Sequence, residues 1–229
     1  MDNYDAVRLV IALVVDIIII LLSINKFILF RKKISTRLIS GTALLTAVEL
    51  VLIVISNYVS IGPVNLNLAL VPIAVAGIIF GPLSGLFVGL VNGLVTVLSP
   101  STQAIFMPLS PFGTVFICLL KTGLAGFFSG LVYVPFKNSH SNKMKLGGSF
   151  LASALVPLIN TGLFTVGCYT FFSNWLFESA ASSNYDNNFL FLIMVILGIN
   201  FIFEFSISIL LSPSINMLVN YYSRKVESK

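Results

Sequence analysis

Residues 112–136 of this chain read FGTVFICLLKTGLAGFFSGLVYVPF, and this stretch decides the fold class. Its one charged residue is Lys121, and the rest of the run is largely apolar. A transmembrane α-helix needs about 20 apolar residues, so the run is long enough to cross a bilayer. A membrane β-strand is about ten residues long and alternates apolar with polar positions, a pattern that is not seen here. The stretch therefore predicts a transmembrane helix with one cation inside it.

The whole chain shares this character. Hydrophobic residues make up 57% of it and charged residues 9%, with a mean hydropathy of +1.03. A soluble domain carries about 25% charged residues, so this composition excludes one. Further apolar runs lie at about 6–30, 38–58, 66–80, 83–98, 146–175 and 189–219, and Pro213 is expected to bend or end the last. We predict an all-α integral membrane protein with about seven spans.

The basic residues predict how the chain is oriented, because Lys and Arg collect on cytoplasmic loops. With the N-terminus outside and the C-terminus inside, the cytoplasmic segments hold Arg31, Lys32, Lys33, Arg37, Lys137, Lys143, Lys145, Arg224, Lys225 and Lys229. The outer segments hold Asp2, Asp5, Glu178 and Asp186, with Arg8 as their only base. The net charge of +5 is thereby explained by membrane topology, and it does not indicate nucleic-acid binding.

Four charged residues fall at membrane depth, where a charge usually faces a cavity or a partner: Asp16, Glu49, Lys121 and Glu204. Two alternatives stay open for Lys121. It forms a structural ion pair with Glu204, or it faces a substrate anion. Glu49 lies two residues after Ala47, hence on roughly the opposite face of its helix.

Polar side chains also recur every fourth residue in the last two runs, which places each series on one helix face. The series are Ser149, Ser153, Pro157, Thr161, Thr165 and Tyr169, then Asn200, Glu204, Ser208 and Ser212. They serve either as hydrogen-bonding contacts between helices or as walls of a polar cavity. We predict a cavity in the outer half, closed by the Ser99–Pro111 loop and the Asn65 turn. Its candidate binding residues are Asn65, Asn92, Lys121, Asn160, Tyr169, Trp175, Asn200 and Glu204, although Tyr169 and Trp175 also suit an interfacial aromatic belt.

Small residues predict where helices pack closely. Glycines stand four apart at Gly77, Gly81, Gly85, Gly89 and Gly93. A second small pair, Ala43 and Ala47, forms an A-x-x-x-A pattern in the second run. The two cysteines, Cys118 and Cys168, lie in apolar runs and His140 is the only histidine, so we predict no catalytic group and no metal site.

Several motifs resemble the substrate-binding S-components of energy-coupling-factor (ECF) vitamin importers. They are Asn65-Leu-Asn-Leu-Ala-Leu-Val-Pro72, Gly81-Pro82-Leu-Ser-Gly85, Lys121-Thr-Gly-Leu-Ala-Gly126, Pro157-Leu-Ile-Asn160-Thr161-Gly162 and Asn200-Phe-Ile-Phe-Glu204. The resemblance covers about residue 36 to the C-terminus. It implies a six-helix substrate-binding domain at 36–229, preceded at 1–35 by an extra transmembrane helix and a basic link that have no counterpart in the family.

The resemblance also implies a function and partners. The chain would be a binding subunit of the bacterial cytoplasmic membrane, not an enzyme, that captures a vitamin or related micronutrient from outside. Ala43 and Ala47 would contact a transmembrane coupling subunit driven by two cytoplasmic ATPases, so ATP would be used by partners and not by this chain. The most similar subgroup includes pantothenate carriers and many members of undefined substrate, and Lys121 would meet the carboxylate of pantothenate. The alternative is a stand-alone proton-coupled secondary transporter of a small polar solute, with Asp16, Glu49 or Glu204 as proton relays.

Overall fold

The computed structural model describes residues 36–56, 60–61, 64–65, 67–139, 141–183, 187–192 and 198–227. The chain divides into two compact units, Met1–Ile39 and Ser40–Lys229. The architecture below is that of the second unit, together with the first turn of α2, which begins at Thr36 in the first unit. Its elements are α2 (Thr36–Ser56), β1 (Ser60–Ile61), β2 (Val64–Asn65), α3 (Leu70–Phe80), α4 (Pro82–Val97), α5 (Pro100–Ile105), α6 (Pro111–Lys137), α7 (Asn142–Phe171), α8 (Ser173–Ser182), α9 (Asn188–Phe191) and α10 (Gly198–Glu227).

The prediction of an all-α membrane protein is confirmed. Among the described residues, four helices are long and apolar enough to cross a membrane: α2, α6, α7 and the Asn200–Tyr221 part of α10. The helices α3 and α4 are shorter and also apolar. The only strands among the described residues are β1 and β2, a two-residue antiparallel ladder between α2 and α3. The predicted N-terminal helix at about 6–30, with Asp16, lies outside the described residues.

Prolines and one glycine mark where helices begin. Pro82, Pro100 and Pro111 each occupy the first turn of a helix, where the missing N–H has no helical partner to lose. Gly81 separates α3 from α4 with a φ of 108°, a left-handed conformation that strains residues with a Cβ. Ser110 caps α6 by accepting a hydrogen bond from the backbone N–H of Gly113.

The glycine series predicted a close helix contact, and the structure confirms it with α6 as the partner. A Cβ added at Gly85 would collide with the carbonyl oxygen of Gly126, and one added at Gly89 with that of Thr122. A Cβ added at Gly93 would lie 2.6 Å from the carbonyl oxygen of Cys118. The backbones of α4 and α6 therefore touch along several turns, with no room for side chains between them.

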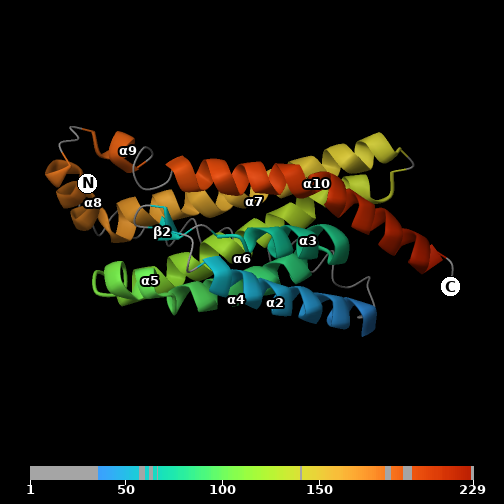
Figure 1. Cartoon of the computed structure of the whole chain (residues 1–229), viewed down its shortest axis with the longest axis horizontal. Helices are drawn as coiled ribbons and strands as arrows, with labels where there is room; N and C mark the ends of the chain where they lie inside the picture. Colours follow the sequence, from blue (N-terminus) through green and yellow to red (C-terminus); the bar gives the residue numbers. More distant parts are fainter. Residues whose placement is uncertain are drawn as a thin grey trace. The chain divides into compact units, whose positions relative to one another are not determined.

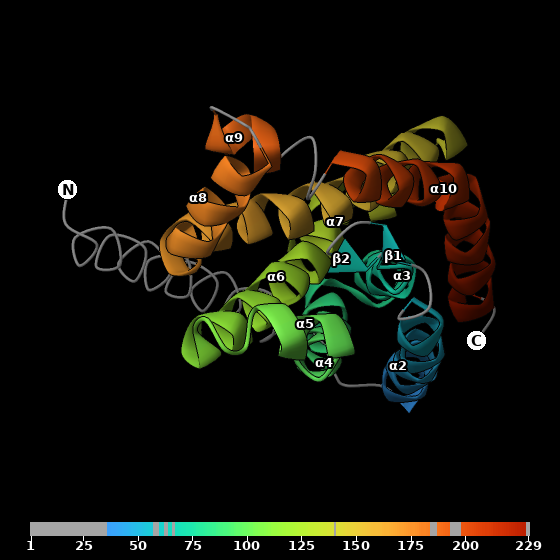
Figure 2. The ribbon, with the colours of Figure 1, turned by 60° about the vertical axis from the view of Figure 1, so that its left-hand side comes forward.

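Three predicted segment boundaries differ in the structure. The Ser99–Pro111 loop contains a short helix, α5, which begins at Pro100. The apolar run predicted at 146–175 ends earlier, because helix α7 ends at Phe171. The polar stretch that starts at Glu178 begins inside a separate helix, α8. The helix α10 continues through Pro213 to Glu227, and its ribbon changes direction part-way along (Figure 2).

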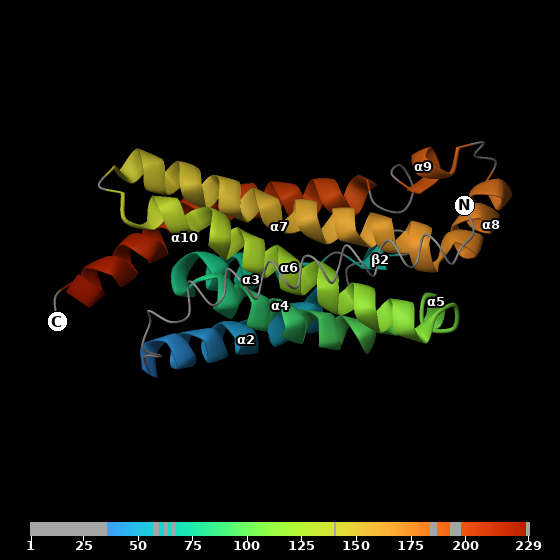
Figure 3. The same cartoon turned by 180° about the vertical axis from the view of Figure 1, so that it is seen from behind.

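Two apolar clusters stabilise opposite ends of the bundle. One joins Phe106, Phe164, Phe172 and Leu176 near α5 and α8. The other joins Ile79, Tyr133, Ile215 and Val219, and beside it Lys137 Nζ donates a hydrogen bond to the carbonyl oxygen of Ile79 at 3.1 Å. In Figure 1, α5, α8 and α9 lie at one end, whereas the α6–α7 connection and the C-terminal end of α10 lie at the other. Figure 3 shows α7 packed beside α6 and α10 from behind.

Candidate functional site

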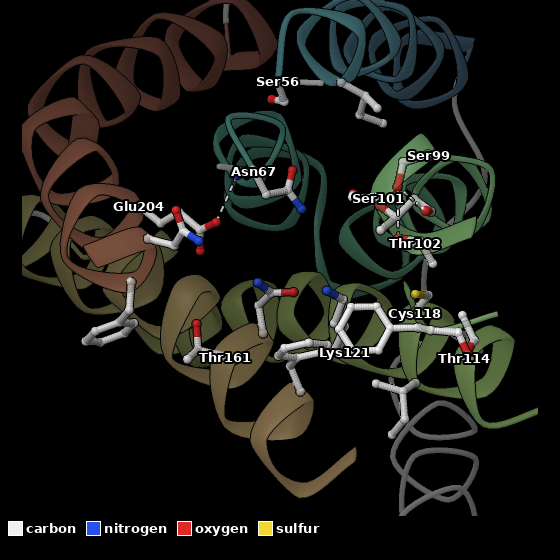
Figure 4. A pocket seen from close by; sticks show the side chains of 18 of the residues that line it. Ser56, Asn67, Ser99, Ser101, Thr102, Thr114, Cys118, Lys121, Thr161 and Glu204 are labelled. Carbon is white, nitrogen blue, oxygen red and sulfur yellow. Dashed lines mark hydrogen bonds between the residues drawn. The ribbon is translucent and has the colours of Figure 1, made fainter. Parts of the chain in front are cut away.

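A pocket opens inside the bundle, toward the end that carries α5 and α8. Polar and apolar side chains from several helices line it together. Its wall comes from α2, the segment before α3, α4, α5, α6, α7, Phe172 and α10. Figure 4 shows Asn67, Glu204, Lys121 and the hydroxyls of Ser99, Ser101 and Thr102 placed around one common space.

Lys121 is the cation of this pocket. It lies midway along α6, its side chain is buried, and its Nζ stands 4.8 Å from the centroid of the Phe164 ring. Within the described part of the chain, its ammonium group has no hydrogen bond and no ion pair. A buried ammonium needs a compensating anion or acceptor, and the cation–π contact supplies only part of that compensation. The group is therefore available to a ligand.

Glu204 lines the same pocket from α10 but does not pair with Lys121. Its Oε1 accepts a hydrogen bond of 2.9 Å from the backbone N–H of Asn67, which lies just before α3. Figure 4 shows this bond as a dashed line. The ion pair that the sequence left open as a structural contact is absent between these two described residues.

Amide side chains connect the pocket wall to the layer behind it. Asn67 Nδ2 donates to Asn92 Oδ1 at 3.1 Å, and Thr96 Oγ1 lies 3.4 Å from the same oxygen. Asn160 on α7 and Asn200 on α10 line the pocket directly. The site thus presents amide groups from α7, α10 and the Asn67 segment.

Hydroxyl groups form the side of the pocket made by α4 and α5. Ser99 Oγ lies 2.9 Å from Thr102 Oγ1 and 2.8 Å from the carbonyl oxygen of Thr96. Thr114 Oγ1 donates to the carbonyl oxygen of Phe106 at 2.8 Å. These bonds hold α5 to the end of α4 and the start of α6, so the hydroxyl wall is ordered by local sequence contacts.

Aromatic rings complete the lining: Phe106, Phe164, Phe172 and Phe201. Phe106 packs edge-on to Phe164, with ring centroids 5.5 Å apart, and against Phe172 at 5.1 Å. A few polar groups set among apolar walls are typical of small-molecule sites. Among the residues described, no group of three or more His, Cys, Asp or Glu side chains is placed to hold a metal ion.

Comparison with protein families now gives this geometry a context. The sequence model described as "ECF transporter, substrate-specific component" matches residues 37–215. The chain belongs to this family. Neither the curated proteins nor the solved structures that were compared give a match. The chain is thus a substrate-specific membrane subunit of the ECF transporters. This family consists of transporter subunits and is not a family of enzymes. The chain is also a multi-pass protein of the bacterial plasma membrane.

The structure brings together only part of the predicted site. Four of the candidates line the pocket of this ECF component: Lys121, Asn160, Asn200 and Glu204. Asn92 stands behind the lining and reaches it through Asn67. Asn65 pairs with Ser60 in the β1–β2 ladder, and the residue that faces the pocket is Asn67, two positions later.

The two aromatic candidates lie away from the pocket. Tyr169 is 37% exposed, and Trp175 packs edge-on to Phe106 at 5.4 Å between ring centroids. Helix geometry explains the first case, because Tyr169 follows the pocket residue Phe164 by five positions and so lies about 140° around α7. Trp175 follows the break between α7 and α8. The aromatic wall is formed by phenylalanines instead.

Sequence reasoning missed Asn67, the α5 hydroxyls and the phenylalanine wall. Asn67 belongs to the same motif as the predicted Asn65, so the signal was present but was assigned two positions too early. The chain has 20 phenylalanines, and the sequence alone does not show which of them line the pocket.

The helix α2 has two different faces. Ala43 and Ala47 are exposed, as are the large apolar side chains of Leu44, Val51 and Val54. Glu49 is fully buried on the opposite side. The prediction that the two alanines and Glu49 occupy opposite faces of one helix is confirmed.

Proposed function

We propose that this chain captures a small micronutrient bearing a carboxylate and delivers it by docking α2 on a transmembrane coupling subunit. Membership of the ECF substrate-specific components supports a capture subunit. The observation that carries the substrate class is Lys121, a buried ammonium that faces the pocket without an acceptor among the described residues. A carboxylate would supply the missing charge and hydrogen bonds.

The rest of the lining narrows the substrate chemistry. Hydroxyls of Ser101, Thr102 and Thr161, together with the amide of Asn160, offer hydrogen bonds to hydroxyl or amide groups of a ligand. Pantothenate carries a carboxylate, an amide and hydroxyl groups on a short flexible chain. These groups match the hydrogen-bonding side chains of the lining, so pantothenate is the first compound to test.

The outer face of α2 supports the docking part of the proposal. Ala43 and Ala47 stand one turn apart on the exposed side of the helix, so a partner backbone can approach closely there. Any ATP would be hydrolysed by the partner ATPases. The ATPases and the coupling subunit would then be recovered with this chain when it is purified under mild conditions.

The substrate proposal is tested by retained ligand and by direct binding. Native mass spectrometry of the protein in mild detergent should show a bound small acid, and calorimetry with pantothenate should give saturable binding. Lys121→Met should weaken that binding by roughly tenfold to a hundredfold, the effect of losing a charged hydrogen-bonded contact of about 1.5–3 kcal/mol. Lys143→Met is the matched control, because it removes a lysine from an exposed position at the start of α7.

Each outcome bears on a separate part of the proposal. Equal loss of affinity in Lys121→Met and Lys143→Met would contradict the anion site. A retained ligand without an acidic group would contradict the substrate class. Purification that never recovers a coupling subunit or ATPases, even from membranes that contain them, would contradict the docking function.

A further inference from the structure

The inner face of α2 makes polar contacts with the bundle, beside the apolar packing of Leu45 and Ile53. Thr42 Oγ1 donates to Ser84 Oγ at 3.1 Å, and Ser56 Oγ accepts from the backbone N–H of Leu68 at 3.1 Å. Between these two contacts, the Glu49 carboxylate faces the Asn92 amide of α4. The opposite face of α2 is apolar and exposed, with Leu44 66% and Val51 60% exposed.

Glu49 begins a series of polar contacts that ends in the pocket. It faces Asn92, Asn92 Oδ1 accepts from Asn67 Nδ2, and the backbone N–H of Asn67 donates to Glu204. Four residues from α2, α4, the Asn67 segment and α10 are thereby connected, with Asn67 contributing both its side chain and its backbone N–H. Glu49 itself does not line the pocket, whereas Asn67 and Glu204 do.

The first contact in this series is loose. Neither carboxylate oxygen of Glu49 completes a hydrogen bond of standard geometry, and neither does Nδ2 of Asn92, although all three atoms are fully buried. A buried acceptor and a buried donor that face one another without bonding are costly. Any shift of α2 that changes their separation therefore changes how firmly Asn92 is held.

We propose that Glu49 is a positioning residue for the substrate pocket, which it controls by holding Asn92 and, through it, the Asn67 segment against Glu204. The position of α2 then sets how open the pocket is. The functional role of this positioning rests on the proposed function, because α2 is the proposed docking helix. A partner that draws α2 away would loosen the Asn67 wall and free the bound substrate.

The test needs neither substrate nor partner, because the chain carries its own probes. Cys118 lines the pocket, whereas Cys168 is fully buried in the apolar cluster at the α5–α8 end and does not line it. Alkylation of the purified protein with iodoacetamide, read by peptide mass spectrometry, reports pocket opening at Cys118 and general unfolding at Cys168. Hydrogen–deuterium exchange at the Asn67 amide reports its bond to Glu204.

Glu49→Leu should raise Cys118 alkylation and Asn67 exchange by roughly tenfold, because the Asn92 amide then faces an apolar side chain instead of a carboxyl group and holds Asn67 less firmly. Cys168 should stay protected, and the melting temperature should stay level or rise, because an apolar residue replaces a buried carboxylate. Glu49→Gln keeps one acceptor for Asn92 and should restore most of the protection. A purely structural role for Glu49 would instead lower the melting temperature.

Thr42→Val is the matched control, because it breaks another contact between α2 and α4 that is not part of the series. It should leave Cys118 and Asn67 as in the wild type. Unchanged labelling in Glu49→Leu, equal opening in Thr42→Val, or exposure of Cys168 together with Cys118 would each overturn the inference. If coupling-subunit recovery fails while these results hold, the proposed function falls and the positioning of the pocket by Glu49 stands.

Discussion

At the residue scale, the proposed substrate class depends on Lys121 and Glu204. They face the same space without pairing, since Glu204 is held by the Asn67 backbone and Lys121 lies over the Phe164 ring. Because the two charges have separate local contacts, they can have separate roles. Under the proposal, Lys121 binds the anion of the ligand, and Glu204 keeps Asn67 in place in the pocket wall.

A double-mutant cycle tests this division. Lys121→Met should lower pantothenate affinity, and Glu204→Gln should lower it less, because a Gln oxygen still accepts from the Asn67 N–H. The double variant Lys121→Met with Glu204→Gln should stay as weak as Lys121→Met or weaker, measured by calorimetry. Recovery of near-normal affinity in the double variant would mean that the two residues only balance each other, and the anion site would be wrong.

The charged residues show how much of the site could be predicted from the sequence. A charge inside a transmembrane run stands out in any composition, so Lys121, Glu49 and Glu204 could be found without a structure. All three are buried in the fold. What the sequence did not reveal is that Glu204 bonds a backbone amide 137 positions away, because that contact depends on how α10 approaches the segment before α3.

At the element scale, helix pitch explains which of the four-apart series were informative. Each step of four residues turns about 40° past a full revolution, so a short series stays on one face and a long one drifts off it. Asn200, Glu204, Ser208 and Ser212 all remain buried. The longer α7 series is buried at Ser149 and Ser153 but has rotated into partial exposure at Tyr169.

The glycine contact between α4 and α6 gives a second prediction. Gly89→Ala should push the Thr122 carbonyl away and destabilise the bundle by about 1–3 kcal/mol, as overpacking does elsewhere. The measurement is the melting temperature in detergent. Gly162→Ala on α7 is the control, since no atom lies within 4 Å of its added Cβ, and it should leave the melting temperature level. Equal losses in both variants would contradict the close α4–α6 contact.

The docking face of α2 gives a third prediction. Ala47→Trp adds bulk on the exposed side of α2 and should abolish recovery of the coupling subunit and substrate uptake, while calorimetric binding by the isolated protein survives. Val166→Trp is the control, a large residue placed at an exposed position of α7. If Ala47→Trp weakens binding as much as uptake, Ala47 belongs to the packed interior and the docking assignment fails.

At the scale of the whole molecule, the charge pattern and the fold agree on which segments share an end. Lys137 contacts the end of α3 through the Ile79 carbonyl, and the apolar cluster beside it includes Ile215 and Val219 of α10. The end of α3, Lys137 and the C-terminal part of α10 therefore lie at one end of the bundle, opposite α5 and α8. The sequence predicted this grouping because basic residues in loops can be identified directly from the sequence. It did not predict the break between α7 and α8, because that break depends on packing around Phe172.

Orientation across the membrane remains a prediction, and labelling tests it. In a variant whose native Cys118 and Cys168 are both replaced by alanine, Ser183→Cys should react with an impermeant maleimide added to intact cells. Ser141→Cys should react only after the membrane is opened. Both positions are exposed, so a difference in labelling reports sidedness and not burial.

The expected sidedness follows from the charges beside positions 141 and 183. Ser141 is flanked by Lys137, Lys143 and Lys145, which favour the cytoplasmic side, and Ser183 follows Glu178. Because the pocket wall includes Phe172 and the α5 hydroxyls, an outward Ser183 also places the pocket mouth outside, where a capture subunit meets its substrate. The reverse labelling would turn the pocket toward the cytoplasm, and capture from outside would then be untenable even if Lys121 binds the same anion.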